Sequence, residues 1–312
     1  MPLGIRPTVD FVFKKIFGSP QNAQALIGLL NAILDLERPI ESVEVLNPFN
    51  YQEFAENKLI VLDVRCRDSA GRSLNVEMQV SAYAGLLERL VYYACSMYVD
   101  QLESGQNYAL AAPAISICLL SRRIFRDSDQ AHHRFQMLDA CSGRTLRNAI
   151  EVHTVELTKY NLSAATIATR PKLEQWTFLL LHAHEYDADQ LTAILPGIEF
   201  EQAIKTIAII SAKAEDRQMY DQREKAQRDY NWAISGAREE GRAEGRDEGH
   251  KEGHKEGRDE GRAEGKLAGK IQMLQELLRD RVSTDIELLN KRPETLAAEL
   301  ATLQQRLRGR DN

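Results

Sequence analysis

The chain has 312 residues, of which 43% are hydrophobic and 28% are charged, and its formal net charge is -6. The apolar share excludes a wholly disordered protein, and the charged share with a mean hydropathy of -0.40 excludes an integral membrane protein. The first apolar segment contains acidic and basic residues and no small-residue cleavage site, so we expect a cytoplasmic protein without a secretory signal. The four cysteines lack zinc-finger or C-x-x-C spacing and predict reduced, mostly buried thiols.

Composition divides the chain into three predicted parts. Residues 1–235 have the composition of a globular domain. Residues 236–270 form a low-complexity repeat in which glycine recurs every four residues, usually after Glu and before a basic residue or His. Because each glycine costs a helix roughly 0.5–1 kcal/mol relative to Ala, the repeat predicts a frayed or partner-dependent helix that acts as a solvated spacer.

Residues 271–312 are predicted to be helical. Leucines repeat there at intervals of four, three and four residues, at Leu296, Leu300, Leu303 and Leu307. This spacing is typical of a short coiled-coil seam. We therefore expect that the chain could form a homo-oligomer through its C-terminal helices.

Within the first 235 residues the apolar pattern predicts alternating helices and strands. A helix is expected at 21–36 and a longer one at 83–103, because apolar residues recur there at three-and-four spacing. Strands are expected at 41–47, 59–67, 74–80, 114–120 and 150–157. The order αβββαβ indicates an α/β fold with a mixed sheet flanked by helices.

Two acidic residues lie on a predicted hairpin around the turn DSAGR. With the turn centred on Ala70, Asp63 stands opposite Glu77 and Arg65 opposite Asn75. Two carboxylates about 5 Å apart on neighbouring strands repel each other. A raised pKa on one carboxyl group, a bridging arginine such as Arg65, or a divalent cation could each compensate. The residues alone favour the arginine-neutralised pair and the metal site about equally.

Three segments with this acidic pair resemble a known family: PTVDFVFKKIFG near the N-terminus, the strand VEMQ, and LERLVYYACSMYVDQLESGQNYALAAPAISICLL after it. The region from about residue 7 to about residue 225 resembles the Rpn family of recombination-promoting nucleases, a transposase-like branch of the PD-(D/E)XK nuclease superfamily. The repeat of EGR and EGK units is similar to that family's C-terminal extension. The resemblance implies a restriction-endonuclease-like fold with a C-terminal helical extension.

The resemblance also implies a function and its residues. It makes Asp63 and Glu77 the ligands of Mg²⁺ or Mn²⁺, and it places Gln79 where most of the superfamily has a catalytic lysine. A neutral amide can orient water or a phosphate oxygen but supplies neither charge nor a base, so slow turnover is expected. Asp10 could add a carboxylate, although a helix N-cap or surface role is an equal alternative. The implied activity is metal-dependent cleavage of DNA in recombination or mobile-element biology.

Binding to DNA requires a local basic patch, because residues 1–230 contain 24 Lys and Arg against 29 Asp and Glu. The densest cluster lies between 122 and 147, where we single out Arg122, Arg123, Arg126 and Arg134 as phosphate contacts, with a solvated insertion as the alternative. The histidine pairs at 132–133 and 182–184 are expected at the surface rather than as metal ligands. A second hypothesis is a catalytically weak or inactive, nuclease-derived protein that binds DNA and assembles.

Overall fold

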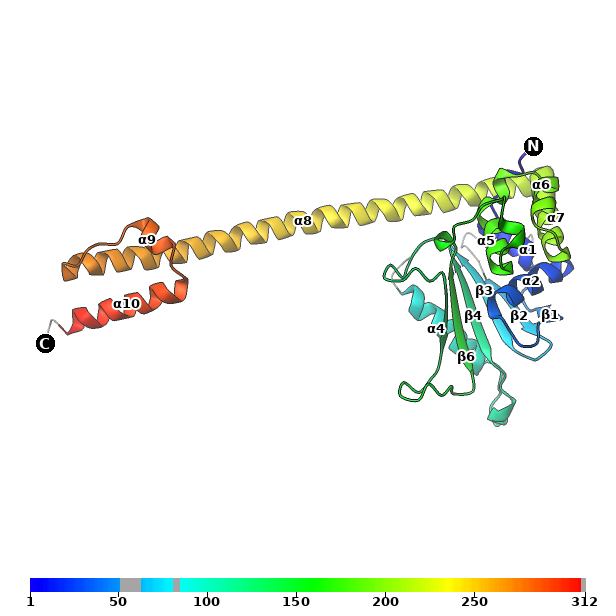
Figure 1. Cartoon of the computed structure of the whole chain (residues 1–312), viewed down its shortest axis with the longest axis horizontal. Coiled ribbons are helices and arrows are strands. Elements are labelled where there is room, and N and C mark those ends of the chain that lie inside the picture. The colour runs from blue at the N-terminus through cyan, green and yellow to red at the C-terminus, as the bar shows by residue number, and fades with distance from the viewer. Residues whose placement is uncertain (51–62, 81–84, 310–312) are drawn as a thin grey trace. The chain divides into compact units, whose positions relative to one another are not determined.

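The computed structural model describes residues 1–50, 63–80 and 85–309. The chain forms two compact units, Met1–Asn231 and Trp232–Asn312 (Figure 1). The division falls within a single helix, α8 (Ala214–Leu278). No helix in the described ranges is both long enough and apolar enough to cross a membrane.

A six-stranded mixed sheet forms the centre of the first unit, in the order β1-β2-β3-β4-β6-β5. The pairs β3–β4 and β4–β6 are parallel, and the other three are antiparallel. The strands are β1 (Val43–Val45), β2 (Asp63–Asp68), β3 (Ser73–Gln79), β4 (Ala114–Leu120), β5 (His132–Gln136) and β6 (Ile150–Glu156). The predicted αβββαβ order and α/β class are confirmed.

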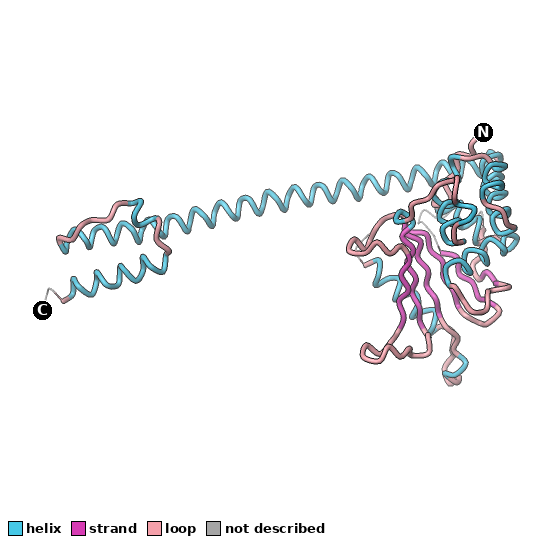
Figure 2. The backbone as a smooth tube through the Cα atoms, viewed as in Figure 1, coloured by secondary structure: helices cyan, strands magenta, loops and turns pink. Residues whose placement is uncertain are grey.

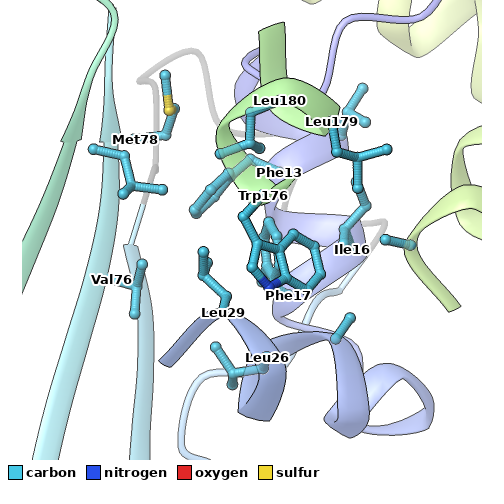
Figure 3. Close-up of a cluster of buried hydrophobic side chains, with 14 of the residues drawn as sticks. Phe13, Ile16, Phe17, Leu26, Leu29, Val76, Met78, Trp176, Leu179 and Leu180 are labelled. Carbon is cyan, nitrogen blue, oxygen red and sulfur yellow. The ribbon is translucent and has the colours of Figure 1, made fainter. Parts of the chain in front are cut away.

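One face of the sheet carries most of the hydrophobic core. Val76 and Met78 of β3 pack there with helices that are far apart in sequence (Figure 3). Trp176 of α5 is buried among Phe17 of α1 and Phe200 of α7, at ring distances of 5.6 and 4.6 Å. The helices of this layer are α1 (Asp10–Phe17), α2 (Ala23–Leu34), α5 (Lys172–His182), α6 (Ala188–Ile194) and α7 (Ile198–Ala212).

The other face is covered by α4 (Leu86–Val99), whose buried residues pack on β4 and β6. The helix begins after Gly85, whose φ of 83° is a left-handed conformation that glycine adopts without strain. The helix ends at Val99 with Asp100 as its C-cap, whereas the prediction extended it to residue 103. Short 3₁₀ helices complete the unit: η1 (Pro20–Asn22), η2 (Tyr108–Leu110), η3 (Leu157–Lys159), η4 (Ile167–Thr169) and η5 (Ala183–Glu185).

The second unit consists of the C-terminal part of α8 with α9 (Asp285–Leu289) and α10 (Pro293–Arg308). The glycine repeat is helical and exposed (Figure 2), where the sequence predicted a frayed or partner-dependent helix. The predicted leucine seam has a partner within the chain: Leu296 and Leu303 are buried against Ile271 of α8 and Leu288 of α9. Leu300 and Leu307 are partly buried in the same cluster.

The strand β5 is absent from the predicted elements. Its sequence HHRFQ contains no aliphatic residue and pairs only with β6, at the edge of the sheet. The predicted strand at 59–67 and the predicted helix at 83–103 both begin outside the described residues, which resume at positions 63 and 85.

Candidate active site

The β2–β3 hairpin brings the predicted acidic pair into register. Asp63 stands opposite Glu77, as predicted from the turn position. Asp68 fixes this register, because its carboxylate accepts hydrogen bonds from the backbone amides of Ala70 (3.0 Å) and Arg72 (2.9 Å) and from the Arg72 side chain (2.6 Å). A single-residue slip would move each side chain to the other face, so this turn determines which residues meet.

Alternation along β3 divides its side chains between the two faces of the sheet. Leu74, Val76 and Met78 belong to the main core. Glu77 and Gln79 point to the opposite face, which α4 covers, and both are buried. The sequence therefore predicted both the strand and the direction of its acidic residue.

Arg89 of α4 binds both polar residues at the end of β3. Its Nη2 atom donates hydrogen bonds to Glu77 Oε1 and, at 3.1 Å, to Gln79 Oε1. Glu77 is 0% exposed, and the Arg89 side chain is 34% exposed. A buried carboxylate without a counter-charge costs several kcal/mol. The arginine that compensates Glu77 is thus Arg89; Arg65, the candidate named from sequence, is exposed on β2.

Arg89 could have been found from helical spacing. It follows Leu86 by three residues, and Leu86 is one of the residues that α4 buries against the sheet. An arginine on that side of the helix points toward the sheet. The ring of Tyr93, one turn further along, lies 5.4 Å from the Arg89 guanidinium and forms a cation–π contact.

Cys118 lies beside Glu77 in the parallel register of β3 and β4. Burial raises the pKa of the Cys118 thiol well above its usual value, and the negative charge of Glu77 raises it further. This environment favours the neutral thiol, which is a poor nucleophile. Cys66 is also buried, Cys95 is half-buried, Cys141 is exposed, and all four cysteines are free.

Asp10 is the first residue of α1 and is 4% exposed. One carboxylate oxygen accepts a hydrogen bond from the Phe11 amide at 2.7 Å, and the other lies 3.5 Å from Nη1 of Arg223 on α8. Burial raises the pKa of Asp10, although the Arg223 charge and the Phe11 amide act in the opposite direction. Asp10 is not the N-cap, which is Val9. The helix α1 packs on the face of the sheet opposite Glu77. The role of Asp10 as a metal ligand stays a prediction.

The carboxyl ends of β3 and β4 lie together, which places two of the predicted phosphate contacts near Gln79. The Ser121 amide donates a 3.1 Å hydrogen bond to the Gln79 carbonyl oxygen. The Ser121 hydroxyl donates a second hydrogen bond to the Val80 carbonyl oxygen. Arg122 and Arg123 follow immediately, and both are exposed. The third, Arg126, is exposed further along the same loop.

This arginine loop, residues 122–130, is anchored by a buried ion pair that the sequence did not reveal. Glu156, at the end of β6, is fully buried and accepts hydrogen bonds from the backbone amides of Ile124 and Phe125. Lys159 pairs with Glu156 and donates to the carbonyl oxygens of Phe125 (2.9 Å) and Gln130 (3.0 Å). The loop therefore has a fixed backbone from which its arginines extend.

The fourth predicted phosphate contact, Arg134, has a partner within the chain. It lies on β5 and makes two hydrogen bonds to Glu151 of β6, at 3.0 and 2.9 Å. Such a two-point pair uses the part of the guanidinium that would bind phosphate. The region is not simply a solvated insertion, because it includes β5.

A chain of polar contacts continues from this pair. Glu151 bonds His153 at 3.2 Å, and His153 bonds His132 at 2.9 Å. Burial lowers the pKa of His132 to about 4, with smaller contributions from neighbouring charges that include His153 and Arg134. His132 and His133 are half-buried on a strand, which corrects their predicted place at the surface. His182 and His184 lie at the end of α5 and in η5.

The oxygen donors at the end of the hairpin suit a hard divalent cation. Glu77 and Gln79 present carboxylate and amide oxygens on one face of β3, and Asp63 lies opposite in the register of β2. Among the side chains that the structure describes, no group of three or more His, Cys, Asp or Glu is arranged to hold a metal ion. The position of Asp63 is known from its backbone register opposite Glu77.

A mixed sheet with an αβββαβ core and an acidic pair across β2 and β3 defines an α/β protein of the restriction-endonuclease-like class. The chain belongs to the PD-(D/E)XK nuclease family transposases, whose family model matches residues 7–237. No curated protein and no solved structure matches the chain. Family membership places it among the nuclease- and transposase-like proteins.

Proposed function

We propose that this protein is a divalent-metal-dependent DNA endonuclease of the recombination-promoting type, which hydrolyses phosphodiester bonds. The observation that carries the proposal is the register of the β2–β3 hairpin, in which Asp63 stands opposite Glu77 at the strand end that also carries Gln79. Asp63 and Glu77 would hold Mg²⁺ or Mn²⁺, and Asp10 is a further candidate ligand.

Each residue has a distinct task in this proposal. The bound cation would polarise the scissile phosphate and lower the pKa of an attacking water. Gln79 would orient that water or a phosphate oxygen through its amide, but it cannot remove a proton. Glu77, the carboxylate next to Gln79 on this face of β3, is already bound to Arg89 and is not available as a base. Turnover should accordingly be slow.

The DNA backbone would contact the arginine loop. Arg122, Arg123 and Arg126 are exposed on a backbone that Glu156 and Lys159 anchor. Guanidinium groups bind phosphate oxygens at two points. A local cluster of such groups can bind the DNA backbone although the net charge of the unit is negative. Arg134 would contribute less, because Glu151 already holds it.

The test is nicking of supercoiled plasmid in Mg²⁺ or Mn²⁺ by the wild type and by Asp63→Asn and Glu77→Gln. The matched control is Glu44→Gln, which makes the same change at an exposed position on the neighbouring strand β1. We expect nicking by the wild type and by Glu44→Gln, and at least a hundredfold loss in the other two variants. Equal nicking by all four proteins, or none by any of them in several metals, would refute the catalytic proposal.

A second candidate is favoured by the ion pair between Arg89 and Glu77, and by Gln79 in place of lysine. On this view the protein is a nuclease derivative with an inert site that binds DNA and assembles. Assembly would need surfaces other than the leucine seam, because those leucines pack within the chain. Light scattering on the full chain and on a truncation at Ser235 tests it: if both proteins are monomers, the assembly hypothesis loses its basis.

A further inference from the structure

Glu77 requires a cation whenever it is ionised, because its side chain is fully buried. Arg89 fulfils this requirement in the structure and also bonds Gln79. The two oxygens that Arg89 binds are therefore among those that a metal ion would bind. A divalent cation that bound these two oxygens would displace the guanidinium from them, so the two cations compete for the same donors.

Arg89 has an alternative place to go. One third of its side chain is exposed, and it reaches Glu77 from α4 rather than from the sheet. The Tyr93 ring lies 5.4 Å from the guanidinium and offers a flat surface with which it already interacts. The side chain can thus leave Glu77 while its charge stays at the edge of the site.

Entry of a divalent cation would change the net charge beside Glu77. Counted by themselves, Asp63, Glu77 and Arg89 carry a net of one negative charge, which disfavours a phosphate directly beside them. Asp10 and Arg223 cancel each other in a separate pair. A divalent cation changes the net to one positive charge, which matches the single negative charge of a phosphodiester. Entry of the metal would therefore add a favourable charge for the phosphate to those that the arginine loop already provides.

We propose that Arg89 is a displaceable counter-ion of the metal site: it neutralises Glu77 until a divalent cation takes its place, and it then contacts the DNA phosphate. This inference rests on the proposed function, because it assumes that Asp63 and Glu77 form the metal site. It couples metal binding to DNA binding, and it makes Arg89 oppose the first step and favour the second.

The experiment measures metal binding and DNA binding on the full chain, without cleavage. Calorimetric titration with Mn²⁺ is carried out on the wild type, Arg89→Leu and Arg89→Lys, with Arg65→Leu, at an exposed position of β2, as the matched control. We expect Arg89→Leu to bind Mn²⁺ about tenfold more tightly, because the competing charge is gone. Arg89→Lys and Arg65→Leu should stay within about threefold of the wild type, since both keep a cation beside Glu77.

Fluorescence anisotropy with a short DNA duplex in Ca²⁺ gives the second readout. The wild type should gain at least tenfold in DNA affinity when the metal is added, whereas Arg89→Leu should lose most of this gain although it binds metal more tightly. A merely structural role for Arg89 would weaken both affinities together. If Arg89→Leu is unfolded in EDTA, its circular dichroism must recover as Mn²⁺ is added.

The outcomes separate this inference from the proposed function. Equal Mn²⁺ affinity in the wild type and Arg89→Leu, or no metal-dependent recovery of an unfolded variant, overturns the inference alone. The expected binding pattern without plasmid nicking supports the inference and refutes only catalysis. If Mn²⁺ binds to neither protein, Arg89 is a permanent partner of Glu77, and both proposals fail.

Discussion

The backbone amide of Ser121 donates a 3.1 Å hydrogen bond to the carbonyl oxygen of Gln79, and this contact joins the end of β4 to the end of β3. Because Arg122 and Arg123 directly follow Ser121, the contact links the proposed catalytic residues to the proposed DNA-binding loop. The two parts of the site therefore share one backbone framework. Their separate contributions can be tested by substitutions in the loop that leave the strands unchanged.

Glutamine substitutions of the exposed arginines in the loop should weaken DNA binding more than the same substitution of Arg134, which is bound within the chain. Arg122→Gln, Arg123→Gln and Arg126→Gln should each lower the slope of log affinity against log salt concentration by about one. Arg134→Gln should change the slope much less, because Arg134 bonds Glu151 at two points. Anisotropy titrations between low and physiological salt give the slopes. A larger change for Arg134→Gln than for the other three would contradict this assignment.

Removal of either partner of the buried pair Glu156 and Lys159 should destabilise the first unit strongly. Both side chains are buried, at 0% and 2% exposure, so removal of either partner leaves an uncompensated charge. We expect Glu156→Gln and Lys159→Met each to lower the free energy of unfolding by about 3–5 kcal/mol. Urea unfolding monitored by the fluorescence of buried Trp176 measures these changes.

The double variant provides the control for that pair. Since neither charge then remains, its cost should be clearly smaller than the sum of the two single costs. The single variants should also weaken DNA binding, because the amides of Ile124 and Phe125 lose their anchor. Additive costs, or single variants as stable as the wild type, would show that the ion pair does not hold the loop.

Stability should depend on pH through His132, whose pKa burial lowers from 6.5 to about 4. The unfolded chain binds a proton near pH 6.5 while the folded chain does not, so this contribution is complete above pH 6.5 and is lost as the pH falls toward 4. His132→Gln should flatten the curve of unfolding free energy in this range. The control His133→Gln changes the neighbouring residue on the opposite face of β5 and should retain most of the slope, because burial rather than the His133 charge is the main cause of the low His132 pKa.

Glu151 also makes stability depend on pH, but in a lower pH range than His132. Burial alone would raise its pKa, but hydrogen bonds from His153, Arg134 and Gln136 lower it from 4.5 to about 2. Its contribution is present above pH 4.5 and is lost as the pH falls toward 2. A loss of stability in His132→Gln that still occurs between pH 6.5 and 4.5 would rule out His132 as its cause.

Much of the fold follows from local sequence. Alternation predicts the buried faces of β2 and β3, and the position of the turn predicts the register of Asp63 with Glu77 that the Asp68 hydrogen bonds hold. These features depend on residues close together in the chain. A hairpin with a defined turn is the case in which spacing alone determines which side chains meet.

The remaining features depend on contacts between distant segments. Arg89 reaches Glu77 only because α4 packs across the sheet, and Lys159 meets the arginine loop only because β6 returns beside β4. The strand β5 has no apolar alternation of its own and forms because β6 offers it a free edge. The leucines of α10 showed a seam, but their spacing could not reveal that α8 and α9 would fill it.

Two glycine-to-alanine substitutions should have opposite effects, because one glycine is enclosed and the other is open. A Cβ atom at Gly28 of α2 would lie 2.7 Å from Glu199 Cβ and 3.3 Å from the Trp176 ring. The Glu199 Cβ is attached directly to its backbone and cannot turn away. We expect Gly28→Ala to lower the free energy of unfolding by about 1–3 kcal/mol, the usual cost of overpacking.

Gly253 of α8 has nothing within 4 Å of such a Cβ, and alanine should stabilise the helix locally by about 0.5–1 kcal/mol. Thermal melting followed by circular dichroism should show more persistent helix in Gly253→Ala. The urea midpoint reported by Trp176 should stay at the wild-type value, because Gly253 and Trp176 belong to different compact units. If Gly28→Ala proved as stable as the wild type, the prediction would be wrong, and α2 and α7 would have to leave room for a methyl group between Gly28 and Glu199.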